Sequence, residues 1–200
     1  MKRIVSIQDI SCVGKCSLTV ALPIISAMGV ECGVIPTAVL STHTGGFSGY
    51  TFRDLTDDMP AIKNHWMKEG IRFDAIYTGY LGSVEQIGMV KEIFQRLLAP
   101  GGMAVVDPAM ADNGVLYKGF DDGYARAMKD LCGCADIILP NITEACMLTG
   151  TQFQTSDIRN VHAADLELVE RERVCYILTY SFPCQDLSLA GTRKLMSDTS

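Results

Sequence analysis

The sequence predicts an α/β protein with a mostly parallel central sheet and helices on both faces. Short apolar runs alternate with longer amphipathic segments along the chain. The short runs are apolar at nearly every position, which is typical of parallel strands that are covered on both faces. With 200 residues, 48% hydrophobic and 20% charged, the chain is long enough for one ordinary domain with a core.

The first elements follow from this alternation. We expect strands at 3–7, 32–40 and 73–79, where the apolar runs lie. Segment 17–29 is predicted to be a helix, and Pro23 inside it predicts a kink or a late start.

The next predicted helix, 83–99, has clear end signals. Ser83 and Gln86 have the spacing of a capping box, and the Ala-Pro-Gly-Gly that begins at residue 99 is expected to end the helix. A strand is expected at 103–107, and its last residue is an acid.

The second half continues the same pattern. We expect a helix at 122–132, a strand at 135–140, a helix at 141–150 and a last strand at 174–180. Ligands of such sheets bind at the carboxyl ends of the strands, so the residues that follow each strand are the candidates for function.

Polar and aromatic residues follow the first three predicted strands. Asp9 and Ser11 are suited to a polar ligand, or belong to a plain strand-to-helix turn. His43 lies in a loop rich in hydroxyls and glycine, which either binds a ring-shaped substrate or is a surface loop. Tyr80 either lines a pocket or packs over the next helix.

Acids follow the later strands. Asp107, before Pro108, is placed to hold Mg²⁺ or its waters, or to cap a turn. Asp112 is expected to face phosphates. Asn141 and Glu144 have the spacing of a capping box, which explains both; alternatively, this helix end faces phosphates and Glu144 reaches a metal through water. Together these residues predict a site for magnesium, phosphate and a small ring.

Several of these segments resemble one family. The segments "IQDISCVGKCSL", "PTAVLSTHTGGFSGYTFRDLT", "YTGYLGS", "VDPAMADNGVLY" and "DIILPNITEA" resemble the pyridoxal/pyridoxamine (vitamin B6) kinases of the ribokinase-like superfamily over residues 1–150. The resemblance implies a ribokinase-like fold and ATP-dependent, Mg²⁺-assisted phosphorylation of the 5′-hydroxyl of pyridoxal, pyridoxine or pyridoxamine.

The resemblance also implies roles for individual residues. The positions that match those around the vitamin ring are Asp9, Ser11, His43, Thr44 and Tyr80. The matching metal residues are Asp107 and Glu144, and the matching ATP-binding residues are Asp112 and Asn141.

One family segment is not found. These kinases carry a late Gly-x-Gly-Asp, whose amides form an anion hole and whose aspartate activates the substrate hydroxyl, and this sequence has no counterpart. The resemblance therefore implies a kinase that is truncated at its C-terminus and that lacks its general base. It is either weakly active or inactive, or a B6 binder without catalysis.

The last part of the chain resembles a different family. We expect 151–200 to be a separate, foreign-looking tail, because 156–200 resembles part of a DNA cytosine-5 methyltransferase. The resemblance rests on the Pro-Cys-Gln of "TYSFPCQDLSLAG" and implies that Cys184 is the nucleophile that attacks cytosine. A methyltransferase fragment is therefore the alternative function.

Composition constrains location and partners. Eight cysteines without a Cys-x-x-Cys pair favour a reduced, cytoplasmic setting. The net charge of −6 argues against nucleic acid as the main partner. The sequence contains no apolar run of the ~20 residues that a membrane span needs. The kinase resemblance implies a B6 vitamer as substrate and a homodimer.

Overall fold

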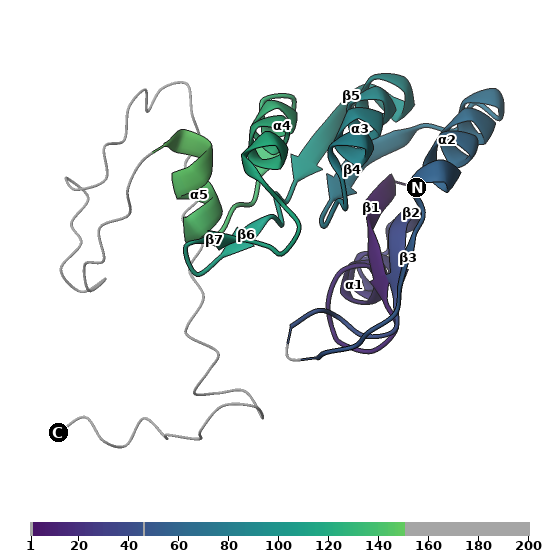
Figure 1. Ribbon diagram of the computed structural model, residues 1–200. Coiled ribbons are helices and arrows are strands. Elements are labelled where there is room, and N and C mark those ends of the chain that lie inside the picture. The colour runs from purple at the N-terminus through teal and green to yellow at the C-terminus, as the bar shows by residue number, and fades with distance from the viewer. Residues whose placement is uncertain (1, 46, 151–200) are drawn as a thin grey trace, which may run out of the picture. The chain divides into compact units, whose positions relative to one another are not determined.

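A six-stranded sheet organises the computed structural model, which describes residues 2–45 and 47–150 (Figure 1). The strand order is β3-β2-β1-β4-β5-β8. Neighbouring strands are parallel, except that β3 runs antiparallel to β2. The strands are β1 (Arg3–Ser11), β2 (Glu31–Leu40), β3 (Phe52–Asp54), β4 (Phe73–Thr78), β5 (Leu98–Val106) and β8 (Ile137–Ile138).

The helices cover both faces of this sheet, as predicted. They are α1 (Leu18–Ala27), α2 (Met59–Lys68), α3 (Val84–Leu97), α4 (Asp122–Cys132) and α5 (Ile142–Thr149). Since β2 and β4 lie on opposite sides of β1, right-handed crossovers place α1 on one face and α2, α3 and α4 on the other. Figure 1 shows α2, α3 and α4 in a row, with α1 beside β1 and β2.

The core lies between the sheet and this row of helices. Val5 and Ile7 of β1 and Ile76 of β4 are fully buried, and they meet Ile87 and Val90 of α3 in one hydrophobic cluster. This burial explains the apolar residues on the face of the sheet that meets α3. No helix among residues 2–45 and 47–150 is both long and apolar enough to span a membrane.

The predicted boundary between helix 83–99 and strand 103–107 is wrong. Helix α3 ends at Leu97 rather than 99, and β5 begins at Leu98 rather than 103. The Ala-Pro-Gly-Gly that we expect to end the helix lies inside β5, where the pairing with β4 shifts register between Phe73 and Ala75. Pairing of Phe73 with Leu98 extends the strand backwards, so contact with the sheet overrides the local turn signal.

The predicted capping box at Ser83 is only half formed. Ser83 Oγ accepts from the Gln86 N–H at 3.2 Å, but the Gln86 side chain does not return to Ser83. Instead Gln86 Oε1 accepts from the Gly82 N–H, and its Nε2 donates to Thr37 O and Thr56 Oγ1. This buried amide therefore connects α3 to β2.

Strand β3, helix α2 and the hairpin of β6 and β7 are absent from the sequence prediction. Helix α2 begins near Pro60 and is followed by Gly70, whose φ is 69°. A two-stranded hairpin, β6 (Ala111–Asp112) and β7 (Val115–Leu116), follows β5. Asn113 and Gly114 at its tip have φ of 51° and 82°, as a type I′ turn requires.

All the described residues belong to one compact unit. The predicted strand 174–180 and Cys184 lie outside the described residues.

Candidate functional site

The side chains of Asp9 and Ser11 lie at the C-terminal end of β1. The strand extends beyond the predicted 3–7 to Ser11, so both residues lie within it and not in the turn that follows. Asp9 is 5% exposed and Ser11 1% exposed, and Ser11 Oγ donates to Asp9 Oδ2 at 3.0 Å. The pairing with β2 shifts register between Gln8 and Ile10, and such irregularities often aim a side chain at a site.

Tyr80 follows β4 and lies near Asp9. Burial raises the pKa of its hydroxyl, and the negative charge of Asp9 raises that pKa further. The hydroxyl therefore stays protonated at neutral pH and can donate a hydrogen bond. The backbone is fixed as well, because Thr37 Oγ1 donates to Tyr80 O at 3.1 Å.

His43 joins the loop after β2 to the loop after β1. Its backbone N–H donates to Val13 O at 3.0 Å, and its ring Nδ1 accepts from the Gly45 N–H at 3.0 Å. The ring lies so close to Gly14 that a Cβ there would be 2.0 Å from His43 Cδ2. His43 is thus held beside the end of β1, whereas Thr44 is exposed and Gly46 lies outside the described residues.

Asp107, just after β5, and Glu144, in the first turn of α5, form an acidic pair. Burial raises the pKa of Asp107 from 3.8 to about 6, and the negative charge of Glu144 also raises it. The Ala109 N–H donates to Asp107 Oδ1 at 3.2 Å, which opposes this shift. The Asp107 N–H donates to Thr78 O at 3.1 Å, so the pair lies next to the end of β4.

Glu144 is bound by three backbone amides. It is 2% exposed; Oε1 accepts from Met110 N at 2.9 Å and Ala111 N at 3.3 Å, and Oε2 accepts from Asn141 N at 2.9 Å. Asn141 Oδ1 accepts from Glu144 N, which completes the predicted capping box, and Asn141 Nδ2 donates to Ala111 O at 2.7 Å. These bonds join the start of α5 to the segment that follows β5.

The acidic pair fits a weakly chelated Mg²⁺. Among residues 2–45 and 47–150, no group of three or more His, Cys, Asp or Glu is arranged to hold a metal. Mg²⁺ commonly takes only one or two protein carboxylates and completes its shell with waters and substrate phosphates. A dication would also relieve the repulsion that raises the Asp107 pKa. Asp112, on β6, is exposed, and its Oδ1 accepts from Asn113 N at 2.8 Å.

Two buried hydroxyls near the strand ends lack a partner within the described part of the chain. They are Oγ1 of Thr78, the last residue of β4, and Oγ1 of Thr42, just after β2. A buried polar atom without a partner usually indicates a water or ligand that satisfies it. Their positions agree with a polar ligand at this edge of the sheet.

Aromatic residues that the sequence analysis did not select connect the two groups. Phe120 stacks on Tyr80, with centroids 5.7 Å apart, and lies 6.4 Å from Tyr117. Burial raises the pKa of Tyr117, and the negative charges of Glu144, Asp112 and Asp107 raise it further.

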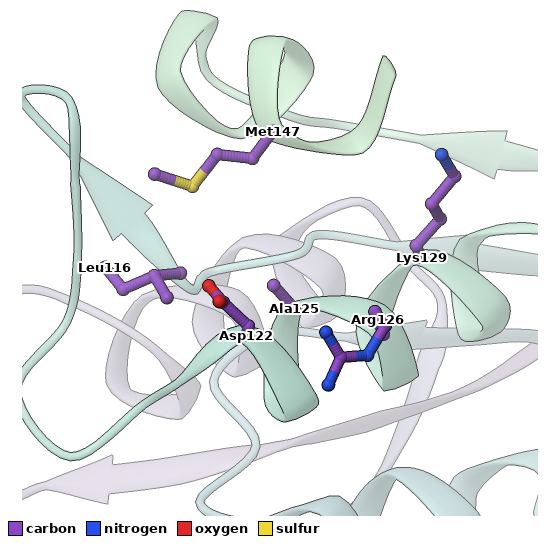
Figure 2. A pocket seen from close by; sticks show the side chains of 6 residues that line it. All are labelled: Leu116, Asp122, Ala125, Arg126, Lys129 and Met147. Atoms are coloured by element: carbon purple, nitrogen blue, oxygen red, sulfur yellow. The ribbon is translucent and has the colours of Figure 1, made fainter. Parts of the chain in front are cut away.

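A cavity of about 350 Å³ lies elsewhere, among α4, β7 and α5 (Figure 2). It is lined by Leu116, Asp122, Ala125, Arg126, Lys129 and Met147. None of the residues predicted for the site lines it.

The structure brings the predicted residues together as two groups. The first contains Asp9, Ser11 and Tyr80, with His43 near the same strand end. The second contains Asp107, Glu144 and Asn141.

The chain has the same fold as several solved structures. A Bacteroides thetaiotaomicron protein described as a phosphomethylpyrimidine kinase, crystallised with pyridoxal, has 43% identity and a TM-score of 0.74, and the match covers 79% of this chain and 55% of that one. Pyridoxal kinase from Lactobacillus plantarum has 39% identity and a TM-score of 0.72, with 78% and 56% covered. These likenesses confirm the predicted α/β fold.

Curated relatives agree. Pyridoxal kinase PdxY of Aliivibrio fischeri is 30% identical, and the match covers 97% of this chain and 66% of the relative. The chain spans 51% of the length of one of the curated relatives it matches and 53% of another. The predicted resemblance to kinases of vitamin B6 is confirmed. The comparisons do not test the resemblance of 156–200 to methyltransferases, which stays a prediction.

A family model also matches most of the chain. The model for phosphomethylpyrimidine kinase matches residues 21–184, and so continues past residue 150, where we expect the kinase-like part to end. The division at 150 likewise stays a prediction. Because the match spans most of the chain and agrees with the fold, the chain belongs to the phosphomethylpyrimidine kinase family.

Proposed function

We propose that this chain carries the vitamin-binding and metal-binding residues of a kinase that transfers a phosphoryl group from ATP to the 5′-hydroxyl of pyridoxal, pyridoxine or pyridoxamine. One observation carries the proposal. In a chain whose sequence is 43% identical to that of a protein crystallised with pyridoxal, Asp9 and Tyr80 lie at the same sheet edge as the acidic pair of Asp107 and Glu144, because the Asp107 N–H donates to the O atom of Thr78, two residues before Tyr80.

The vitamin-binding group supplies both acceptors and donors. Asp9 offers carboxylate oxygens, oriented by Ser11, and Tyr80 offers a protonated hydroxyl. Because His43 Nδ1 accepts a hydrogen bond, the neutral imidazole carries its proton on Nε2 and can donate to a ring substituent. Thr44 extends the same loop. Together these groups would orient a substituted pyridine.

The acidic group would hold the nucleotide's metal. Mg²⁺ neutralises charge on the transferring phosphoryl group when it is bound. Asp107 would be the direct carboxylate ligand, since only one hydrogen bond, from Ala109, occupies it. Glu144 is committed to three amides and would act through water, while Asp112 and Asn141 would line the phosphate-binding segment.

Turnover and binding can be measured separately. Pyridoxal with MgATP should yield pyridoxal phosphate, which is detected by its absorbance, and calorimetry should show pyridoxal binding. Because the sequence has no Gly-x-Gly-Asp, binding without turnover would support a non-catalytic B6 binder. If neither binding nor turnover is observed in folded protein, the proposal fails; Asp9→Asn, which should weaken binding, serves as the specificity control.

We also propose a cytoplasmic homodimer. The six cysteines of the described residues are free, as in a reducing compartment. Sedimentation of the purified chain tests the dimer, which a single monomeric species over a wide concentration range would exclude.

A further inference from the structure

The backbone fixes Phe120 between a tight turn and a helix cap. The Phe120 N–H donates to Tyr117 O at 3.0 Å, and Gly119, with φ of 95°, occupies the third position of this turn. A type II turn needs a residue with positive φ there, which glycine supplies without strain. On the other side, Asp121 caps α4 by accepting from the Tyr124 N–H at 2.8 Å. The position of Phe120 is therefore set independently of any ligand.

The Phe120 ring connects a buried anchor to Tyr80. It stacks on Tyr124 with centroids 3.7 Å apart and planes 6° apart, and on Tyr80 at 5.7 Å and 22°. Tyr124 is 3% exposed, and its hydroxyl donates to Leu81 O at 2.6 Å. Both the residue after Tyr80 and the ring on which Tyr80 stacks are thus held by the start of α4.

The side-chain torsions of Tyr80 remain free for this stack to restrain. Thr37 holds its backbone carbonyl, so the direction of the ring depends on the side-chain torsions. An aromatic ring on its face narrows these torsions and keeps the hydroxyl near Asp9.

We propose that Phe120 is a positioning residue: by stacking on Tyr80 it holds that ring in the orientation that receives the flat ring of a B6 vitamer. This inference rests on the proposed function. Phe120 acts through Tyr80 and is not assigned a contact with the vitamer. Its removal should weaken binding by leaving Tyr80 to be ordered at the moment when the ligand binds.

Calorimetric titration of pyridoxal into purified variants tests this role. Phe120→Leu should raise the dissociation constant about three- to tenfold, the range expected for loss of one aromatic pair. Phe120→Tyr keeps the ring and should restore wild-type affinity. Phe94→Leu is the matched control, because Phe94 is buried in the core on α3; it should lower the melting temperature without changing the dissociation constant. Phe120→Met is a second ringless variant, and circular dichroism verifies the fold of each.

A double-mutant cycle with Tyr80→Leu separates positioning from general destabilisation. If Phe120 acts through Tyr80, Phe120→Leu should have no further effect on affinity in the Tyr80→Leu background. Additive effects, or an unchanged affinity of Phe120→Leu while the wild type binds pyridoxal, would overturn the inference alone. Absence of pyridoxal binding by the folded wild type would overturn the proposed function together with it.

Discussion

Replacing Glu144 tests whether its carboxylate holds the acidic end of the sheet together. In Glu144→Ala, the N–H groups of Met110, Ala111 and Asn141 lose their common acceptor in a region where Glu144 is 2% exposed. Each buried donor left without a partner costs about 1–3 kcal/mol, and two of these donors, Met110 N and Ala111 N, are buried, so we expect a loss of about 2–6 kcal/mol in the free energy of unfolding. Against a typical total of about 5–15 kcal/mol, this is a large fraction.

Urea unfolding followed by circular dichroism measures the loss. A decrease of this size should lower the urea midpoint by on the order of 1–2 M. Glu144→Gln keeps one acceptor oxygen but turns its amide N–H groups toward another donor, so its loss should be intermediate. Glu69→Ala, at an exposed glutamate after α2, is the matched control and should change stability by less than about 0.5 kcal/mol. If Glu144→Ala is no more destabilising than Glu69→Ala, the three hydrogen bonds to Glu144 do not stabilise this end of the sheet.

Two further changes test the acidic pair and the His43 loop. The folded state raises the pKa of Asp107 from 3.8 to about 6, so folding favours the protonated carboxyl group. The stability that this carboxyl group contributes is therefore present below pH ~4 and is lost as the pH rises through ~6. Asp107→Asn should therefore gain on the order of 2–3 kcal/mol relative to wild type across that window in urea unfolding, and Mg²⁺ should stabilise only the wild type at pH 7; parallel pH profiles would contradict this. Gly14→Ala should cost about 1–3 kcal/mol more in thermal unfolding than Gly29→Ala, because both glycines have positive φ but only Gly14 faces His43. His43→Ala should recover part of that difference, and equal losses at the two glycines would refute the contact.

The sequence identified those parts of the fold that local patterns specify. Strands β1, β2 and β4 could be predicted because their apolar residues enter the core, and the Asn141–Glu144 capping box depends only on residues three apart. It could not specify where β5 begins, because the pairing of Leu98 with Phe73 is decided by the neighbouring strand and not by the Pro-Gly-Gly beside it.

The candidate site shows the same division. Asp9, Asp107 and Glu144 could be selected because each lies at the end of an expected strand or the start of an expected helix. Phe120 could not, because its contact with Tyr80 joins residues far apart in the sequence. The commitment of Glu144 to the amides of Met110 and Ala111 is likewise a long-range contact. The sequence predicted its cap but not this second role.

Proton relaxation of bound pyridoxal in the presence of Mn²⁺ tests the central claim most directly. Mn²⁺ binds the same oxygen ligands as Mg²⁺ and is paramagnetic, so it broadens the signals of nearby protons. If the ring site at Asp9 and Tyr80 adjoins the metal site at Asp107, Mn²⁺ with ATP should broaden the signals of bound pyridoxal in the wild type and much less in Asp107→Asn. Bound pyridoxal whose signals Mn²⁺ leaves sharp would show that the two groups do not form one site.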